Sequence, residues 1–313
     1  MQAVFLDRGT FSEGVDLPAP TGITDYITYD DTVSDPEIII ARCKDAEIII
    51  ANKVKITAEV ISRLPNLKLI QLTATGMDNV DQEACDKHGV TLYNVAGYAV
   101  KSVPEHTFLL MLNAMRAGLY YHNKVVDGSW HSDGNFCLLD IPLIDLEDKT
   151  LGIIGVGTIG KRVTEIAQAF GMTVLWADHQ GREPRNEDYT AFDEVLAQSD
   201  VISLHCPLTE QTQHLINQDT LAKMTKQPLL VNVARGGIVD SQALAEAVHN
   251  EQILGYASDV FEQEPIVADD PLLTLKDHPR VIFSPHNAWG SKSAQETLWQ
   301  ILSKQVADFI HQQ

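Results

Sequence analysis

Short apolar runs alternate with helical patterns along the first hundred residues. Apolar runs of strand length occupy residues 3–6, 47–51, 68–72 and 90–94, and helix-period patterns occur near residues 36–43, 57–64 and 80–87. Strands that alternate with helices in this way predict a parallel sheet covered by helices.

The same alternation returns in the second half of the chain. Strands are expected at residues 151–154, 173–177, 201–204, 228–233, 253–258 and 281–283, with helices near residues 191–198, 217–224 and 241–250. The length of 313 residues also suggests about two domains. The pattern therefore predicts an α/β protein with two doubly wound parallel sheets.

Two further helices carry the sequence signature of a capping box. The pairs are Ser102 with Glu105, before a helix at residues 106–116 that can continue to about 126, and Ser293 with Glu296, in a helix that ends at residue 310.

A glycine-rich turn follows the strand at residues 151–154 and opens a helical pattern. Gly155 permits a tight turn, Gly157 lets the backbone approach a pyrophosphate, and Gly160 lets the helix pack close to the sheet. The amides at Thr158 and Ile159, with the positive end of the helix dipole, then face the anion. The turn predicts a dinucleotide site, although a similar turn in another α/β protein remains an alternative.

An acidic residue ends the next predicted strand, at the distance expected from such a turn. Asp178 can accept hydrogen bonds from an adenosine ribose and would repel a 2′-phosphate, so NAD is favoured over NADP. Arg182 and Arg185 follow closely and weaken that preference.

Composition and charge exclude several classes of protein. The chain is 44% hydrophobic and 21% charged, as in ordinary globular proteins, and its net charge of −20 argues against binding to nucleic acid or anionic lipid. The four cysteines are scattered, so no metal site or disulfide is expected. Without an export signal or a long apolar stretch, the sequence predicts a cytoplasmic protein.

Candidate chemistry lies just after three successive predicted strands. Arg235 follows one strand and has the planar guanidinium that suits a 2-oxo carboxylate. Glu264 and His286 follow the next two, where a carboxylate can hydrogen-bond and orient an imidazole that acts as acid or base. Each alone has a plainer explanation: a turn cation, a solvated acid and an exposed histidine. Together they predict a catalytic set.

With these segments, the chain resembles the D-isomer-specific 2-hydroxyacid dehydrogenase family over nearly its whole length. The segments that carry the resemblance are residues 73–81, 155–160, 205–209, 232–240, 259–265 and 284–289. Trp130, residues 135–137 and Trp289 are most similar to the glycerate dehydrogenase, or hydroxypyruvate reductase, group of that family.

The resemblance implies a role for each matching residue. Arg235 binds substrate, Glu264 supports His286, and His286 is the acid/base. The residues implied to bind ligands are Thr75 and Gly76 for the substrate carboxylate, Asp259 for the nicotinamide carboxamide, and Pro207 and Thr212 beside the cofactor.

The resemblance also implies the arrangement of the domains. Residues 1–100 and 288–313 would form a flavodoxin-like substrate-binding domain, and residues 101–287 a Rossmann domain that binds NAD. A cleft between them would close on hinges near residues 100 and 288. A homodimer would use residues 101–149, of which 128–149 lack clear periodicity.

The implied activity is reversible reduction of a small 2-oxo acid by NADH to a D-2-hydroxy acid, with hydroxypyruvate or glyoxylate favoured as substrate. Other enzymes of the family, acting on phosphoglycerate or D-lactate, remain alternatives. The segment 73–81 contains no Lys or Arg for a phosphate, although Lys53 could supply one charge. A nicotinamide-responsive binding protein, like the family's transcriptional corepressors, is an alternative of another class.

Overall fold

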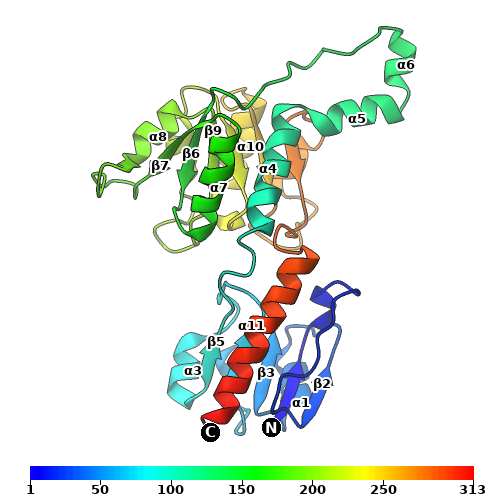
Figure 1. Ribbon diagram of the computed structural model, residues 1–313, viewed down its shortest axis with the longest axis vertical. Helices are drawn as coiled ribbons and strands as arrows, with labels where there is room; N and C mark the ends of the chain where they lie inside the picture. The colour runs from blue at the N-terminus through cyan, green and yellow to red at the C-terminus, as the bar shows by residue number, and fades with distance from the viewer. The chain divides into compact units, whose positions relative to one another are not determined.

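Two parallel sheets organise the chain, and each belongs to a separate unit of the computed structural model, which describes residues 1–313 (Figure 1). Unit 1 comprises Met1–Ala99 and Trp289–Gln313, and unit 2 comprises Val100–Ala288. The prediction of two doubly wound α/β sheets is confirmed.

Unit 1 contains a five-stranded sheet in the order β2-β1-β3-β4-β5, with every neighbouring pair parallel. This is the flavodoxin-like strand order. The elements are β1 (Gln2–Phe5), a 3₁₀ turn η1 (Arg8–Thr10), β2 (Asp25–Thr28), α1 (Pro36–Cys43), β3 (Ile48–Ala51), α2 (Ala58–Ser62), β4 (Leu69–Leu72), α3 (Gln82–His88), β5 (Thr91–Tyr93) and α11 (Lys292–His311). The edge strand β2 was not predicted, because its sequence Asp-Tyr-Ile-Thr is short and only half-buried.

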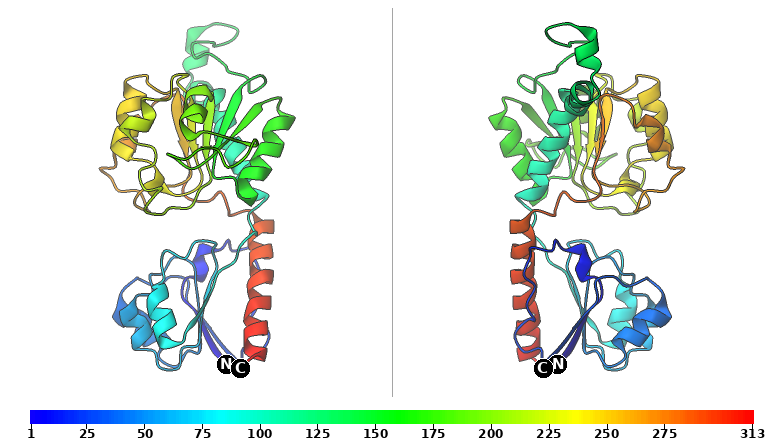
Figure 2. Two further views of the ribbon diagram at one scale, coloured as in Figure 1. Left: turned by 90° about the vertical axis from the view of Figure 1, so that its left-hand side faces the viewer. Right: turned by 90° about the vertical axis from the view of Figure 1, so that its right-hand side faces the viewer.

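Helices cover both faces of this sheet, so its central strands β3 and β4 are fully buried. Figure 2 shows α1, α2 and α3, coloured blue to cyan, on one face and the red helix α11 on the other. Leu298, Trp299, Leu302 and Val306 of α11 pack against Phe5 and its neighbours. The last helix of the chain therefore shares one hydrophobic core with its first strand.

Unit 2 contains a seven-stranded parallel sheet in the order β12-β11-β10-β9-β6-β7-β8. Across the sheet from the β8 edge, the first six strands are β8, β7, β6, β9, β10 and β11. With β6 numbered 1, this is the order 3-2-1-4-5-6 of a dinucleotide-binding fold. The strands are β6 (Thr150–Ile154), β7 (Thr173–Ala177), β8 (Tyr189–Thr190), β9 (Val201–Leu204), β10 (Leu229–Asn232), β11 (Gly255–Ser258) and β12 (Val281–Phe283). The sequence did not indicate the two-residue strand β8.

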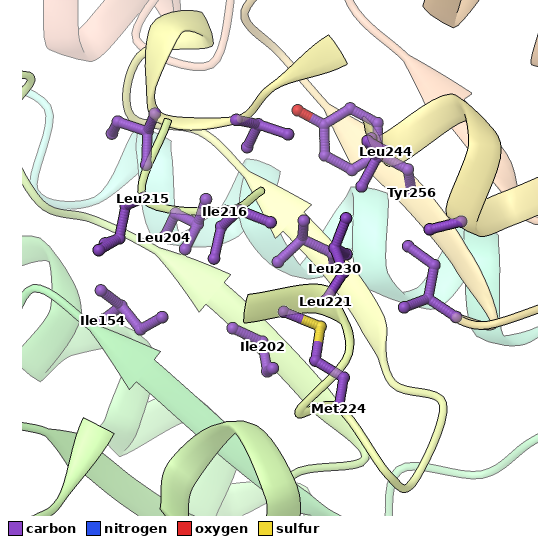
Figure 3. Packing of buried hydrophobic residues seen from close by; sticks show 14 of the residues in the cluster. Ile154, Ile202, Leu204, Leu215, Ile216, Leu221, Met224, Leu230, Leu244 and Tyr256 are labelled. Atoms are coloured by element: carbon purple, nitrogen blue, oxygen red, sulfur yellow. The ribbon is translucent and has the colours of Figure 1, made fainter. Parts of the chain in front are cut away.

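Two layers of helices cover the sheet of unit 2. The helices of unit 2 as a whole are α4 (Ser102–Met115), α5 (Gly118–Val126), α6 (Ser129–Asp133), α7 (Thr158–Ala169), α8 (Phe192–Gln198), α9 (Gln218–Leu221) and α10 (Ser241–His249), with 3₁₀ turns η2 (Gly236–Ile238) and η3 (Pro271–Leu275). Helices α4 and α7 pack on one face, and α8, α9 and α10 on the other. Figure 3 shows the second layer, in which Ile202, Leu204 and Leu230 of the strands meet Leu221 and Leu244 of the helices.

Both predicted capping boxes are wrong. Helix α4 begins at Ser102 itself, whose hydroxyl donates to the Ala288 carbonyl (2.5 Å) instead of capping the helix. Helix α11 begins at Lys292 and is capped by Ser291, which accepts from the amide of Ala294 (3.3 Å). The sequence signature could not show that a tertiary contact occupies the hydroxyl of Ser102. It also could not show which of two nearby serines, Ser291 or Ser293, caps α11.

The apolar pattern of α4 does not continue as one helix to residue 126. Ala117 has a left-handed backbone (φ 48°), so α4 ends at Met115 and α5 starts at Gly118. Helices α5 and α6 contain no buried residue, and Figure 1 shows them projecting from the sheet of unit 2. We call residues 118–145 the arm. No helix of the protein has both the length and the apolar character needed to cross a membrane.

A buried arginine holds the end of α4 in place. The guanidinium of Arg280, only 5% exposed, donates Nη1 to the carbonyls of Ala114 and Met115 (2.9 Å each) and Nη2 to the carbonyl of Pro142. These carbonyls include helix-end groups that have no partner within the helix. Arg280, which directly precedes β12, therefore joins the end of α4 to the last part of the arm.

Replacing Arg280 with Met should lower the free energy of unfolding by about 2–4 kcal/mol, because buried carbonyls lose charge-assisted donors. Urea denaturation followed by circular dichroism measures this change. Arg116→Met is the matched control, since Arg116 makes only an exposed ion pair with Asp145 and should cost less than about 1 kcal/mol. Equal midpoints for the two variants would contradict the role of Arg280.

Candidate active site

The glycine turn after β6 contains two glycines that the protein itself requires. A Cβ on Gly155, whose φ is +100°, would lie 2.3 Å from the amide nitrogen of Cys206. A Cβ on Gly160 would lie 2.4 Å from the carbonyl oxygen of Gly155. Any side chain at either position would therefore displace the backbone of β9's loop or of the turn.

Gly157 is different, because a Cβ there would meet no protein atom within 4 Å. It is the N-cap of α7, and no side chain caps that helix start. The first-turn amides, beginning at Thr158 and Ile159, are thus left to an anionic ligand. This open position is what a pyrophosphate would require, so the turn fits a dinucleotide.

A cavity of about 700 Å³ adjoins the turn and collects residues from three strand ends. Its lining includes Gly155, Asp178, Arg185, Pro207 and Thr212. Thr212 accepts a hydrogen bond from the Thr209 amide (2.7 Å) and donates to the Pro207 carbonyl (2.6 Å), which fixes the loop after β9. Four of the residues proposed for the cofactor from sequence therefore line one cavity.

The carboxylate of Asp178, predicted from the sequence to accept hydrogen bonds from an adenosine ribose, already has protein donors. It accepts hydrogen bonds from the His179 amide (2.7 Å) and from the Arg185 amide, Nε and Nη2 (2.7, 2.9 and 2.7 Å). The guanidinium of Arg185 holds the pKa of Asp178 well below its usual range. Arg185 also lies over the ring of Tyr189, 4.3 Å from its centroid.

Three other candidate residues follow three neighbouring strands of the same sheet. Arg235 follows β10, Glu264 follows β11, and His286 follows β12. Because parallel strands end at the same edge, these loops leave the sheet on one side. His286 Nδ1 lies 2.5 Å from Glu264 Oε2, so the imidazole and the carboxylate form a hydrogen-bonded pair.

Hydrogen bonds fix the backbone at Arg235 and at His286. Asn232 Nδ2 donates to the Arg235 carbonyl (2.9 Å), and His286, with φ +51°, donates its amide to the Asp259 carbonyl (2.8 Å). A Cβ on Gly236 would lie 1.8 Å from the carbonyl carbon of Phe261. The loop of Arg235 thus packs directly on the loop that leads to Glu264.

A buried carboxylate joins the loop of His286 to helix α4. Asp259, 1% exposed, accepts from the Ser284 hydroxyl (2.6 Å) and from the amides of Asn287 and Ala288 (3.0 and 2.9 Å). His106 Nε2 lies 2.8 Å from Ser284 Oγ and 3.5 Å from Asp259 Oδ1. Asp259 therefore holds the segment on either side of His286.

Neither His106 nor the Ser284 hydroxyl was predicted from the sequence to take part in the site. Ser102 and His106 are four residues apart, which places them on the same side of α4, and both contact the segment 284–288. The i, i+4 spacing of two polar residues at the start of an apolar helix was the available signal.

Thr75 and Gly76 belong to unit 1 and follow strand β4. The Thr75 hydroxyl donates to the Val95 carbonyl (2.9 Å), and Asn94 Nδ2 donates to the Thr75 carbonyl (2.7 Å). The nearby side chain of Thr73 is buried without a hydrogen-bond partner for its hydroxyl. Asp81 caps α3 through the Ala84 amide (2.9 Å).

The sequence and fold match known dehydrogenases. Residues 108–288 match the model of the NAD-binding domain of D-isomer-specific 2-hydroxyacid dehydrogenases. The chain is 40% identical over 310 residues to glycerate dehydrogenase of Methylorubrum extorquens, covering 99% of this chain and 95% of that protein. It is 35% identical over 316 residues to hydroxypyruvate reductase of Blautia hydrogenotrophica, covering 99% and 97%.

A solved structure gives the same result. D-lactate dehydrogenase from Aquifex aeolicus, complexed with NAD and lactic acid, aligns with a TM-score of 0.82 at 32% identity over 99% of this chain and 96% of that one. The class is therefore that of NAD-dependent dehydrogenases. Within it, the chain belongs to the D-isomer-specific 2-hydroxyacid dehydrogenase family, and the predictions of an enzyme, of NAD as cofactor and of this family are confirmed.

The glycine geometry predicts opposite consequences for two alanine variants. Gly157→Ala adds a methyl group only to ligand space, and its φ of −85° suits alanine, so the variant should fold normally and bind NAD⁺ roughly tenfold more weakly. Gly160→Ala should instead lower the melting temperature, because its Cβ overlaps the Gly155 carbonyl. Thermal melts and NAD⁺ titrations measure both. If Gly157→Ala bound NAD⁺ with the wild-type affinity, the cofactor would not lie in contact with Gly157.

Proposed function

We propose that the protein reduces hydroxypyruvate or glyoxylate with NADH to D-glycerate or glycolate. The observation that carries the proposal is the 2.5 Å contact between His286 Nδ1 and Glu264 Oε2, in an NAD-binding unit that also presents Arg235. The similarity to glycerate dehydrogenase of Methylorubrum extorquens and to hydroxypyruvate reductase of Blautia hydrogenotrophica, at 40% and 35% identity over nearly the full chain, favours hydroxypyruvate.

The histidine pair supplies the proton. A carboxylate can only accept, so Glu264 requires the proton on Nδ1 of His286, and Nε2 is the ring nitrogen that exchanges a proton with the substrate. In the reductive direction, Nε2–H of the imidazolium donates its proton to the carbonyl oxygen, and Glu264 stabilises and orients the ring. In the reverse direction, Nε2 of the neutral ring accepts the proton of the hydroxyl group.

Arg235 supplies the positive charge. Its guanidinium can bind the carboxylate of a 2-oxo acid through two parallel hydrogen bonds and polarise the adjacent ketone. Negative charge that develops on the carbonyl oxygen is stabilised by the same cation. When bound, NADH supplies the hydride that reduces the carbonyl carbon.

The remaining ligand residues follow the same proposal. The backbone amides at Thr75 and Gly76 bind the substrate carboxylate, and residues 1–100 with 288–313 serve as the substrate-binding domain. Residues 101–287 bind NAD(H) through the glycine turn, with Pro207 and Thr212 beside it and Asp259 near the nicotinamide carboxamide. Asp259 is also committed to three donors of the loop 284–288, so its side chain positions His286 as well.

Turnover of NADH with a panel of 2-oxo acids tests the proposal. Hydroxypyruvate or glyoxylate should give a kcat/KM at least about tenfold above pyruvate and phosphohydroxypyruvate, because residues 73–81 offer no cation for a phosphate. His286→Gln should lower kcat by roughly 10²–10⁴ with little change in NADH affinity.

His88→Gln is the matched control, since His88 is exposed on α3, and it should keep the wild-type rate. If the protein reduced none of these 2-oxo acids, the proposed activity would be contradicted. If the two histidine variants had equal rates, His286 would not be the acid/base of the reaction. A preference for pyruvate or phosphohydroxypyruvate would reassign the substrate.

We also propose that the arm mediates a homodimer. Apolar side chains are exposed along it, including Val126 (71%), Phe136 (96%) and Leu139 (67%). Exposed apolar groups gathered on one segment are typical of an interface between subunits.

Light scattering should therefore give a mass of about twice the 34.6 kDa of one chain. Phe136→Ser should shift the protein towards the single-chain mass, because the interface loses buried apolar area. The control is Val33→Ser, an exposed apolar residue of unit 1, which should leave the mass unchanged. A wild-type protein with the mass of one chain would contradict the dimer.

A further inference from the structure

We propose that Arg185 enables the cofactor site to bind NADP(H) as well as NAD(H), by neutralising the carboxylate that would otherwise repel a 2′-phosphate. The inference extends the family's NAD site and does not depend on which 2-oxo acid is reduced. The ion pair of Arg185 and Asp178 lies in the lining of the cavity beside the glycine turn.

The usual discrimination against NADP depends on a free carboxylate. Such a group accepts the ribose hydroxyls of NAD and repels a phosphate at the same place. Here Asp178 already has four donors, two on each oxygen, and three of them come from Arg185. A ribose hydroxyl must therefore compete with a guanidinium for the carboxylate.

The charges that line the cavity favour an additional phosphate. They are the carboxylate of Asp178 and the guanidinium groups of Arg182 and Arg185, so the lining carries one net positive charge. A 2′-phosphate would meet a neutralised Asp178–Arg185 pair and a second cation, and the repulsion by Asp178 would be offset.

Arg185 also has the donors needed for both tasks. Its guanidinium has five N–H groups, of which Asp178 takes one on Nε and one on Nη2. Three N–H groups are left for a phosphate while the ion pair persists. Contact with the Tyr189 ring keeps the guanidinium at the cavity, and the side chain is 47% exposed, so a ligand can reach it.

Calorimetric titration of the full chain with NAD⁺ and with NADP⁺ tests the proposal without any substrate. In the wild type, the two dissociation constants should agree within about tenfold. Arg185→Ala should weaken NADP⁺ at least tenfold and leave NAD⁺ unchanged or tighter, because the freed carboxylate again accepts the ribose and repels the phosphate. Asp178→Asn should act in the opposite direction, tightening NADP⁺ and weakening NAD⁺.

Arg63→Ala is the matched control, since it removes one positive charge from an exposed ion pair in unit 1 and should leave both constants unchanged. The preference of the wild type for NAD⁺ should also increase with salt, because the phosphate contact is electrostatic. A wild-type preference for NAD⁺ above a thousandfold would overturn the proposal. Equal weakening of both cofactors in Arg185→Ala would do the same, since Arg185 would then only maintain the loop. Failure of the oxo-acid panel would affect neither result.

Discussion

The buried carboxylate of Asp259 is the interaction on which the geometry of the candidate site depends. A carboxylate at 1% exposure is costly unless hydrogen bonds replace its water, and the Ser284 hydroxyl and the amides of Asn287 and Ala288 do so. Those donors lie on both sides of His286 in the chain, so satisfying Asp259 also sets the path of the loop. His106, through Ser284, ties the same loop to helix α4. The position of the imidazole is therefore a consequence of electrostatics in the core, not of the exposed loop itself.

The glycine turn shows how packing and ligand binding share one short segment. Gly155 and Gly160 are required by close backbone contacts inside the protein, whereas Gly157 faces open space. The first two let α7 begin close to β6, which aims the uncapped amides of the helix start at that space. Close packing and the proposed approach of the cofactor thus depend on different glycines, although all three belong to one motif.

Charge at the two ends of the cofactor region is balanced differently. In the cavity beside the glycine turn, Asp178 is paired with a guanidinium, which leaves the pair neutral and the cavity lining net positive. At the proposed catalytic set, Glu264 is paired with His286, and an imidazole is a cation only when it holds two protons. In our proposals the first pair affects which cofactor binds, and the second moves a proton. The difference follows from the partner, since arginine keeps its charge and histidine titrates.

The sequence alone determined the two parallel sheets, the glycine turn and the three strand-end residues, because hydrophobic periodicity and turn chemistry act over a few neighbouring residues. It did not determine the edge strand β2, the break at Ala117 or the caps of α4 and α11, since each depends on weak local preferences that tertiary contacts override. Only the folded structure decided that Asp178 is paired with Arg185 and that His106 reaches Ser284. Those two contacts need side chains to be placed in three dimensions by separate elements, and no spacing along the chain encodes that placement.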